Sequence, residues 1–295
     1  MMRYRMTVSG LVIDIVIHAV LIIAALSCLF PIIHILAVSF SSPGPAMAGQ
    51  IGLWPKQFTT DAYKYIATRV EFWRAMGVTV RRVALGLVVN SILTVLCAYP
   101  LSKTAHRFPQ RKYFVAFFLW AMLFSGGLIP TYMTVYRTGI MGSVWALVLP
   151  GAVPLFNVIV LLNFFRDIPG EIEEAAFIDG AGHWTVLTRI YLPLSTAALA
   201  TVTLFVVIGH WNAWFDGLIY NNRPEGYPLQ SYMQTILVSM DFTRLNFNEI
   251  LRLAQISDRT IKASQVFLGC MPVLLVYPFL QRYFTKGLVL GSVKG

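Results

Sequence analysis

Five carboxylates lie close together in a chain that is otherwise poor in charge. Only 12% of the residues are charged. One segment of the chain, 166–193, nevertheless holds the acidic residues Asp167, Glu171, Glu173, Glu174 and Asp179. Two neighbouring carboxylates can act as a general acid–base pair. A cluster of them can also be a solvated connector, or the charged rim of a surface that another protein binds.

The residues around the carboxylates predict two short amphipathic helices joined at a glycine elbow. Pro169 suits the first position of a helix, and glutamates in the next turn are favoured by the helix dipole. Gly180 then interrupts the helical pattern. Ala175 and Ala176, next to the elbow, form a surface of small residues that a second protein could approach closely. They favour a docking surface over a connector or a catalytic pair.

The composition indicates a polytopic membrane protein. Hydrophobic residues make up 57% of the chain, and an apolar helix of roughly 20 residues can cross a bilayer. Six stretches meet this requirement: about 11–39, 77–101, 114–135, 143–165, 194–215 and 264–281. Backbone groups in lipid must be paired, so these stretches are predicted to be helices. We therefore expect an all-α fold with six transmembrane helices in one domain, 1–295.

The short loops predict the orientation. The loop 102–113 carries four basic residues, whereas the loop after the third predicted span carries only Arg137. Because basic residues concentrate in short cytoplasmic loops, we expect both termini and the segment 166–193 to be cytoplasmic. The long loop 216–263 is then outside. The apolar run that begins near residue 11 is too long for a signal peptide, so we expect an uncleaved first span.

The sequence contains no G-x-x-x-x-G-K-[ST] phosphate loop, no G-x-G-x-x-G, no H-E-x-x-H and no C-x-x-C. Its three cysteines are scattered through the apolar stretches, which argues against a metal site. The candidates for ionisable residues inside the membrane are Asp14, His18, His34 and His210. We therefore predict no catalytic residue, no metal and no cofactor in this chain, and no nucleic-acid partner despite a net charge of +10. An ion-coupled secondary transporter remains an alternative.

The segment 166–193 contains the pattern E-A-A-x3-G-x9-I-x-L-P without a gap. The matching residues are Glu174, Ala175, Ala176, Gly180, Ile190, Leu192 and Pro193. This pattern resembles the EAA motif in the coupling loop of permease subunits of bacterial ATP-binding-cassette (ABC) importers. Nearly the whole chain fits that family. The stretch 98–103 resembles the family's second span, and the Asp179-Gly180-Ala181 variant resembles the carbohydrate-uptake branch. The stretches 209–220 and 287–295 resemble its maltose-permease-like group, particularly the oligosaccharide permeases.

The resemblance implies a transport subunit in the bacterial inner membrane. Glu174 would make a charged contact with a separate ATPase subunit, while Ala175, Ala176 and Gly180 would permit its close approach beside Asp179. ATP and Mg²⁺ would be bound by two such ATPase subunits. A second homologous permease would complete a heterodimer, and an extracytoplasmic solute-binding protein would deliver an oligosaccharide.

Aromatic and polar residues at the outer end of the fifth predicted span are candidates for the substrate pathway: His210, Trp211, Asn212 and Trp214. Residues three or four apart share a helix face, and such a face could contact the ring and hydroxyls of a sugar. An interfacial aromatic belt is the alternative. The outward segments include Arg223, Arg244, Arg252, Arg259 and Lys262. An anionic oligosaccharide such as a fragment of alginate would suit them, and so would an acidic binding protein.

Overall fold

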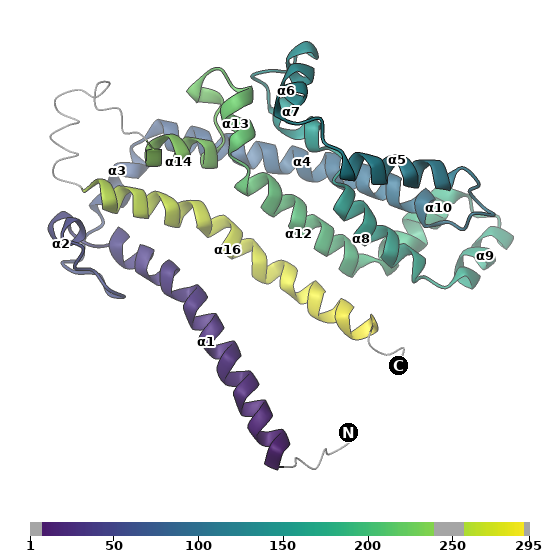
Figure 1. Ribbon diagram of the computed structural model, residues 1–295, viewed down its shortest axis with the longest axis horizontal. Helices are drawn as coiled ribbons and strands as arrows, with labels where there is room; N and C mark the ends of the chain where they lie inside the picture. The colour runs from purple at the N-terminus through teal and green to yellow at the C-terminus, as the bar shows by residue number, and fades with distance from the viewer. Residues whose placement is uncertain (1–7, 239–256, 292–295) are drawn as a thin grey trace. The chain divides into compact units, whose positions relative to one another are not determined.

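The computed structural model describes residues 8–238 and 257–291, and these form helices joined by turns (Figure 1). The predicted all-α fold is confirmed. Among the described residues the only extended pairing is one isolated bridge between Ser41 and Phe58. The chain forms two compact units, Met1–Val70 with Ile236–Cys270 and Glu71–Thr235 with Met271–Gly295. Arg244, Arg252 and the last residues of the predicted tail, 292–295, lie outside the described residues.

The first unit contains α1 (Val8–Ser39), α2 (Pro43–Met47), α3 (Asp61–Ala67) and the beginning of α16 (Asp258–Gly291). The start of α16 is held to the end of α1 and to α2. Ser264 donates to the Ser39 carbonyl at 3.4 Å, and Arg259 donates to the Ala46 carbonyl at 3.1 Å. Apolar side chains along α1 are exposed, as expected of a helix whose environment is lipid or another membrane helix.

Helix α4 (Val70–Ser102) is central to the second unit, and its buried and exposed residues follow the distribution expected of a membrane helix. One stripe of buried residues recurs every three or four positions: Phe72, Ala75, Thr79, Arg82, Gly86, Asn90, Thr94 and Ala98. Much of this buried stripe is polar or small, whereas Val80, Val88 and Ile92 are exposed. A helix in lipid is expected to turn its small and polar side chains toward other helices and its apolar side chains outward. Helix α4 has this arrangement.

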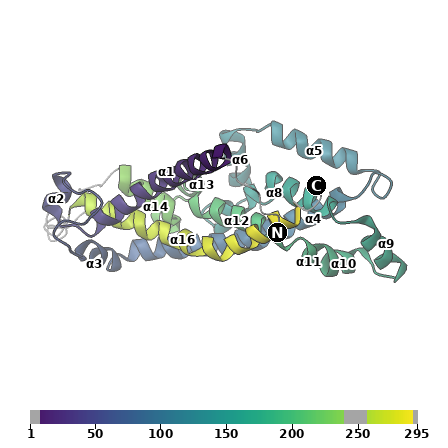
Figure 2. The same ribbon diagram turned by 90° about the horizontal axis from the view of Figure 1, so that it is seen from below.

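Helices α8 (Leu155–Arg166) and α12 (Thr196–Asn212) lie beside α4 in the same unit, as Figures 1 and 2 both show. Buried residues of α4, α8 and α12 share one hydrophobic core with residues of the segment 166–193. At the opposite end of α12 the chain continues through α13 (Phe215–Tyr220), η3 (Pro224–Gly226) and α14 (Leu229–Val238). The segment 166–193 therefore lies at one end of α12, and the segment from α13 to α14 lies at the other.

The predicted third span is not one continuous helix. It consists of α5 (Arg111–Leu123) and α6 (Leu128–Arg137), which meet at an angle of 113°. The break falls at Ser125-Gly126-Gly127, where Gly127 has a φ of +81°, and Pro130 follows in the first turn of α6. Glycines in tandem and a proline explain why the apolar run cannot stay helical.

The fourth predicted span is also interrupted, since it comprises α7 (Val144–Val148), η1 (Leu149–Gly151) and α8, bent by 51°. The fifth, 194–215, contains the continuous helix α12, which meets the preceding helical run His183–Leu194 at 83°. In the described part of the chain, three helices are long and apolar enough to cross a membrane unbroken: Gly10–Ser39, Val70–Ser102 and Asp258–Val276. The described residues give up to six such spans if each bent pair forms one.

Candidate functional site

The segment 166–193 forms the two helices and the elbow that the sequence predicts. Helix α9 (Gly170–Ile178) is followed by α10 (His183–Val186), a π-helical segment η2 (Leu187–Tyr191) and α11 (Leu192–Leu194). Gly180 has a φ of +81°. The amide of Gly180 donates to the Phe177 carbonyl at 3.0 Å, and that of Ala181 donates to the Ala176 carbonyl at 2.9 Å. These paired bonds are a Schellman motif, which glycine permits.

The elbow presents small and apolar residues at the surface. Ala175 is exposed, and Ile178 and Trp184 are 86% and 68% exposed. Asp179 and Gly180 are exposed too, whereas Ala176 is half-buried against the core. Large exposed apolar side chains around a glycine elbow are typical of a surface that a partner covers.

Glu173 holds α9 to the end of α4. Its carboxylate accepts a hydrogen bond from Lys103 Nζ at 2.7 Å and another from Tyr191 Oη at 2.8 Å. Arg107 lies 3.2 Å from the same carboxylate and donates to Glu174 at 2.9 Å. The Lys103 ammonium also lies 3.9 Å and 4.0 Å from the ring centres of Tyr99 and Tyr191.

This contact is an ion pair shielded from water. Glu173 and Lys103 are only 4% and 8% exposed. Burial by itself raises the pKa of the Glu173 carboxyl, but hydrogen bonds from Lys103 and Tyr191 and the charges of Lys103 and Arg107 outweigh it. The net result is a pKa below the usual value, so the carboxylate is ionised at neutral pH. Movement of α9 must therefore also move the end of α4, or else break the pair.

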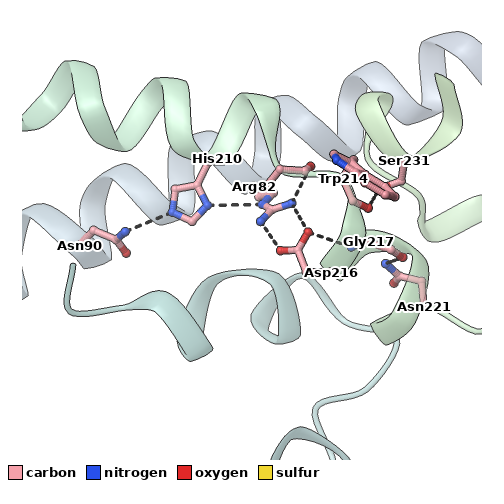
Figure 3. Close-up of polar contacts among 9 residues, drawn as sticks. Arg82, Asn90, His210, Trp214, Asp216, Gly217, Asn221 and Ser231 are labelled. Carbon is pink, nitrogen blue, oxygen red and sulfur yellow. Dashed lines mark hydrogen bonds and ion pairs between the residues drawn. The ribbon is translucent and has the colours of Figure 1, made fainter. Parts of the chain in front are cut away.

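Near the middle of α4 and at the C-terminal end of α12, a second buried polar cluster surrounds Arg82 (Figure 3). The Arg82 guanidinium forms a two-pronged ion pair with Asp216, with one contact of 3.1 Å. Its Nε donates to His210 Nδ1 at 3.3 Å, and its Nη1 also donates to the Ala213 carbonyl at 3.3 Å. The Asn90 amide lies 3.2 Å from His210 Nε2. These contacts connect α4 with α12 and with the start of α13.

A cavity of about 370 Å³ opens beside this cluster within the second unit. Its polar lining comes from Arg82, Asn90, Asn157, His210, Asp216 and Tyr220, and its apolar wall includes Leu147, Pro154 and Phe205. The cavity is therefore mostly apolar with a few convergent polar groups, which is the usual make-up of a small-molecule site.

Comparison with known proteins identifies the family, although no family model matches the chain. Protein LplC of Bacillus subtilis (strain 168) is 39% identical over 267 residues, which cover 90% of each chain. From the same organism, the polygalacturonan/rhamnogalacturonan transport system permease protein YtcP is 37% identical over 282 residues. The match covers 96% of this chain and 98% of YtcP.

A chain in the crystal structure of a bacterial ABC transporter involved in the import of the acidic polysaccharide alginate has the same fold. Its TM-score is 0.86 at 31% identity, and the match covers 94% of this chain and 98% of that one. The chain belongs to the permease family of bacterial ABC carbohydrate importers. The resemblance of the chain to this family is thereby confirmed.

In this permease the predicted pathway residues do not share a helix face. Helix α12 ends at Asn212, and Ala213 is extended, with its carbonyl bonded by Arg82 instead of by a helical amide. His210 and Trp211 are consequently buried, Asn212 is exposed, and Trp214 is 41% exposed at the start of α13. The expectation of one continuous sugar-stacking face over His210, Trp211 and Trp214 is wrong. Of the four residues, only His210 lines the cavity.

Two central residues of these clusters are missing from the sequence-based candidates. Arg82 lies inside the predicted span 77–101, and a charged residue within a predicted span is itself an indication of function. Glu173 differs from its neighbour Glu174 only in the side of α9 that it occupies. Its partners Lys103 and Tyr191 are 70 and 18 residues away along the chain, and no sequence spacing indicates them.

Proposed function

We propose that this permease forms half of the membrane pathway of an importer that moves oligosaccharides by ATP hydrolysis. A second homologous permease forms the other half, two ABC ATPase subunits bind ATP and Mg²⁺, and a solute-binding protein delivers the substrate from outside. The permease itself then carries no cofactor and catalyses no reaction. In this arrangement both termini and the segment 166–193 face the cytoplasm. The observation that carries the proposal is the identity of 37% to YtcP over nearly the whole of both chains.

The segment 166–193 serves, in this proposal, as the docking site for an ATPase subunit. Ala175 and Gly180 permit close approach, Ile178 and Trp184 supply exposed apolar surface, and Glu174 and Asp179 supply charge at its rim. The buried Glu173–Lys103 pair then transmits motion of α9 to α4. Because α4 also carries Arg82 and Asn90, this helix joins the docking site to the cavity.

The substrate class that we infer is a uronate-containing oligosaccharide. Support comes from two similar proteins, one named for polygalacturonan and rhamnogalacturonan transport and one from a transporter that imports alginate. The pathway residues proposed in this chain are His210, Trp211, Asn212 and Trp214, near the outer end of α12. Trp214 is the one whose exposed ring remains available for stacking on a sugar.

The test is co-purification of the permease with its ATPase subunits, followed by measurement of oligosaccharide-stimulated ATP hydrolysis. We expect Ala175→Trp to abolish ATPase binding, because Ala175 is exposed and a large ring there blocks close approach. Glu225→Trp is the matched control, since Glu225 is exposed at the opposite end of the second unit. ATPase retention by Ala175→Trp equal to that of the control would refute the docking assignment.

A further inference from the structure

The hydrogen-bonding pattern around His210 fixes which group of the Asn90 amide is left without a partner. Arg82 Nε always carries a proton, so His210 Nδ1 must accept, and the neutral ring carries its proton on Nε2. The structure places Asn90 Nδ2 3.2 Å from Nε2 (Figure 3), but two N–H donors cannot bond to each other. Nε2 needs an acceptor, which Asn90 provides when its amide is turned over so that the oxygen faces His210. The NH₂ group of Asn90 then occupies the other position, which is buried and has no hydrogen-bond partner among the described residues.

An unpartnered amide at this position indicates a ligand. Asn90 is 4% exposed and lines the cavity of about 370 Å³. A buried polar group without a hydrogen-bond partner destabilises the folded protein. A hydrogen-bond acceptor on a ligand in the cavity would satisfy the NH₂ group of Asn90. Asp216 lines the same space and has oxygen lone pairs beyond those used by Arg82 and Gly217. It can accept a hydrogen bond from the ligand.

The charges of the cavity exclude a carboxylate as that ligand group. Arg82 is the one cation in the lining, and Asp216 neutralises it through two contacts. A carboxylate placed here would lack a free counter-charge and would lie close to Asp216, which is unfavourable in a buried site. A hydroxyl group fits instead, because it can accept from Asn90 and donate to Asp216 at the same time.

We propose that the cavity beside α4 and α12 binds the uncharged, hydroxyl-bearing face of one sugar ring, with Asn90 as donor and Asp216 as acceptor. The inference rests on the proposed function, and it adds that this site does not recognise the carboxylates of a uronate substrate. Their recognition belongs to other groups of the importer. A neutral sugar of the same ring geometry therefore occupies the cavity as well as a charged one.

A cysteine at the cavity wall can report occupancy directly. Gly151 lines the cavity, is exposed, and has open space where a side chain would be added. Gly151→Cys is introduced into the purified complex after Cys28, Cys97 and Cys270 are replaced by alanine. Alkylation of the new cysteine is then followed with trigalacturonate or with its carboxyl-reduced, neutral counterpart. Gly77→Cys is the control, because Gly77 is exposed and outside the cavity lining.

We expect both trisaccharides to slow alkylation of Gly151→Cys at concentrations within about threefold of each other, and neither to protect Gly77→Cys. Adding Asn90→Leu should raise the protecting concentration about fivefold or more, as expected for the loss of one buried hydrogen bond. Asn163→Leu, an exposed asparagine on α8 outside the lining, should leave it unchanged.

Protection by the charged trisaccharide alone would overturn the inference, as would equal protection in Asn90→Leu and the parent. Absence of protection in a complex whose ATP hydrolysis responds to trigalacturonate would overturn it while leaving the proposed function intact. A complex whose ATP hydrolysis responds to no oligosaccharide would remove the proposed function and the inference together.

Discussion

Glu173 and Glu174 are neighbours in the sequence but lie in opposite environments. Glu173 is buried against Lys103 and Tyr191, while the side chain of Glu174 is 62% exposed and contacts only the partly exposed Arg107. A buried ion pair that loses one partner leaves an uncompensated charge, whereas an exposed pair contributes little. The two glutamates should therefore respond very differently to the same substitution.

We predict that Glu173→Gln lowers the free energy of unfolding by about 3 kcal/mol, because Lys103 is left buried without a counter-charge. Glu174→Gln should cost less than about 1 kcal/mol. Thermal unfolding of the two variants in the same detergent provides the comparison. Equal stabilities would show that the buried pair does not secure α9 to α4.

Acidification should weaken the same contact. The pKa of Glu173 lies below its usual value of 4.5, so its ionised form stabilises the folded state. That contribution is complete above pH 4.5 and is lost as the pH falls through the lower pKa of the folded protein. We expect the melting temperature of the parent to fall more steeply than that of Glu173→Gln from about pH 5 to about pH 3. Parallel curves would contradict the assignment.

At the level of residues, the sequence indicates the docking surface better than the cavity. The pattern around Glu174 and Gly180 is local, so its helix start, elbow and exposed small residues follow from adjacent positions. The Arg82 cluster joins residues more than 100 positions apart, and the sequence does not show that Arg82 ends α12 by bonding the Ala213 carbonyl.

Among the elements, the elbow between α9 and α10 depends on the left-handed backbone of Gly180. A side chain at a positive φ costs about 1–2 kcal/mol, so we predict that Gly180→Ala distorts the elbow and lowers oligosaccharide-stimulated ATP hydrolysis severalfold. Gly170→Ala is the matched change at the other end of α9, where φ is not positive and no atom obstructs a methyl group. Full stimulation in Gly180→Ala would show that the elbow geometry is dispensable.

The crossing of α4 and α12 depends on a second glycine. A Cβ at Gly86 would overlap the imidazole of His210, so Gly86→Ala must displace that ring from Arg82 and Asn90. Overpacking of this kind costs about 1–3 kcal/mol. Gly77→Ala on the same helix meets nothing within 4 Å, and should be neutral or stabilising because alanine favours helix. Equal melting temperatures for the two variants would argue against the tight crossing.

Apolar run length predicts where helices lie but not where they bend. The long helices α1, α4 and α16 include the predicted stretches 11–39, 77–101 and 264–281. The stretch 114–135 contains Ser125-Gly126-Gly127, which divides it into α5 and α6. The glycine pair indicates this break in the sequence, but a criterion based on hydropathy alone does not detect it.

For the whole molecule, the second unit places the docking surface at the C-terminal end of α4 and the cavity beside the middle of the same helix. Lys103 follows the C-terminal end of this helix and pairs with Glu173, whereas Arg82 and Asn90 lie on either side of its middle, beside the cavity. A single helix of 33 residues thus connects the surface proposed to meet the ATPase with the site proposed to meet the substrate. In the proposed function, this connection couples ATP hydrolysis to transport.

Uptake of labelled trigalacturonate into proteoliposomes tests this account most directly. The vesicles contain the permease with its permease partner and ATPase subunits, and the solute-binding protein is added on the opposite side from ATP. We predict uptake that requires ATP and the binding protein and is unchanged when proton and sodium gradients are collapsed. Uptake by this chain alone, driven by an ion gradient without ATPase subunits, would contradict the account and establish an ion-coupled transporter.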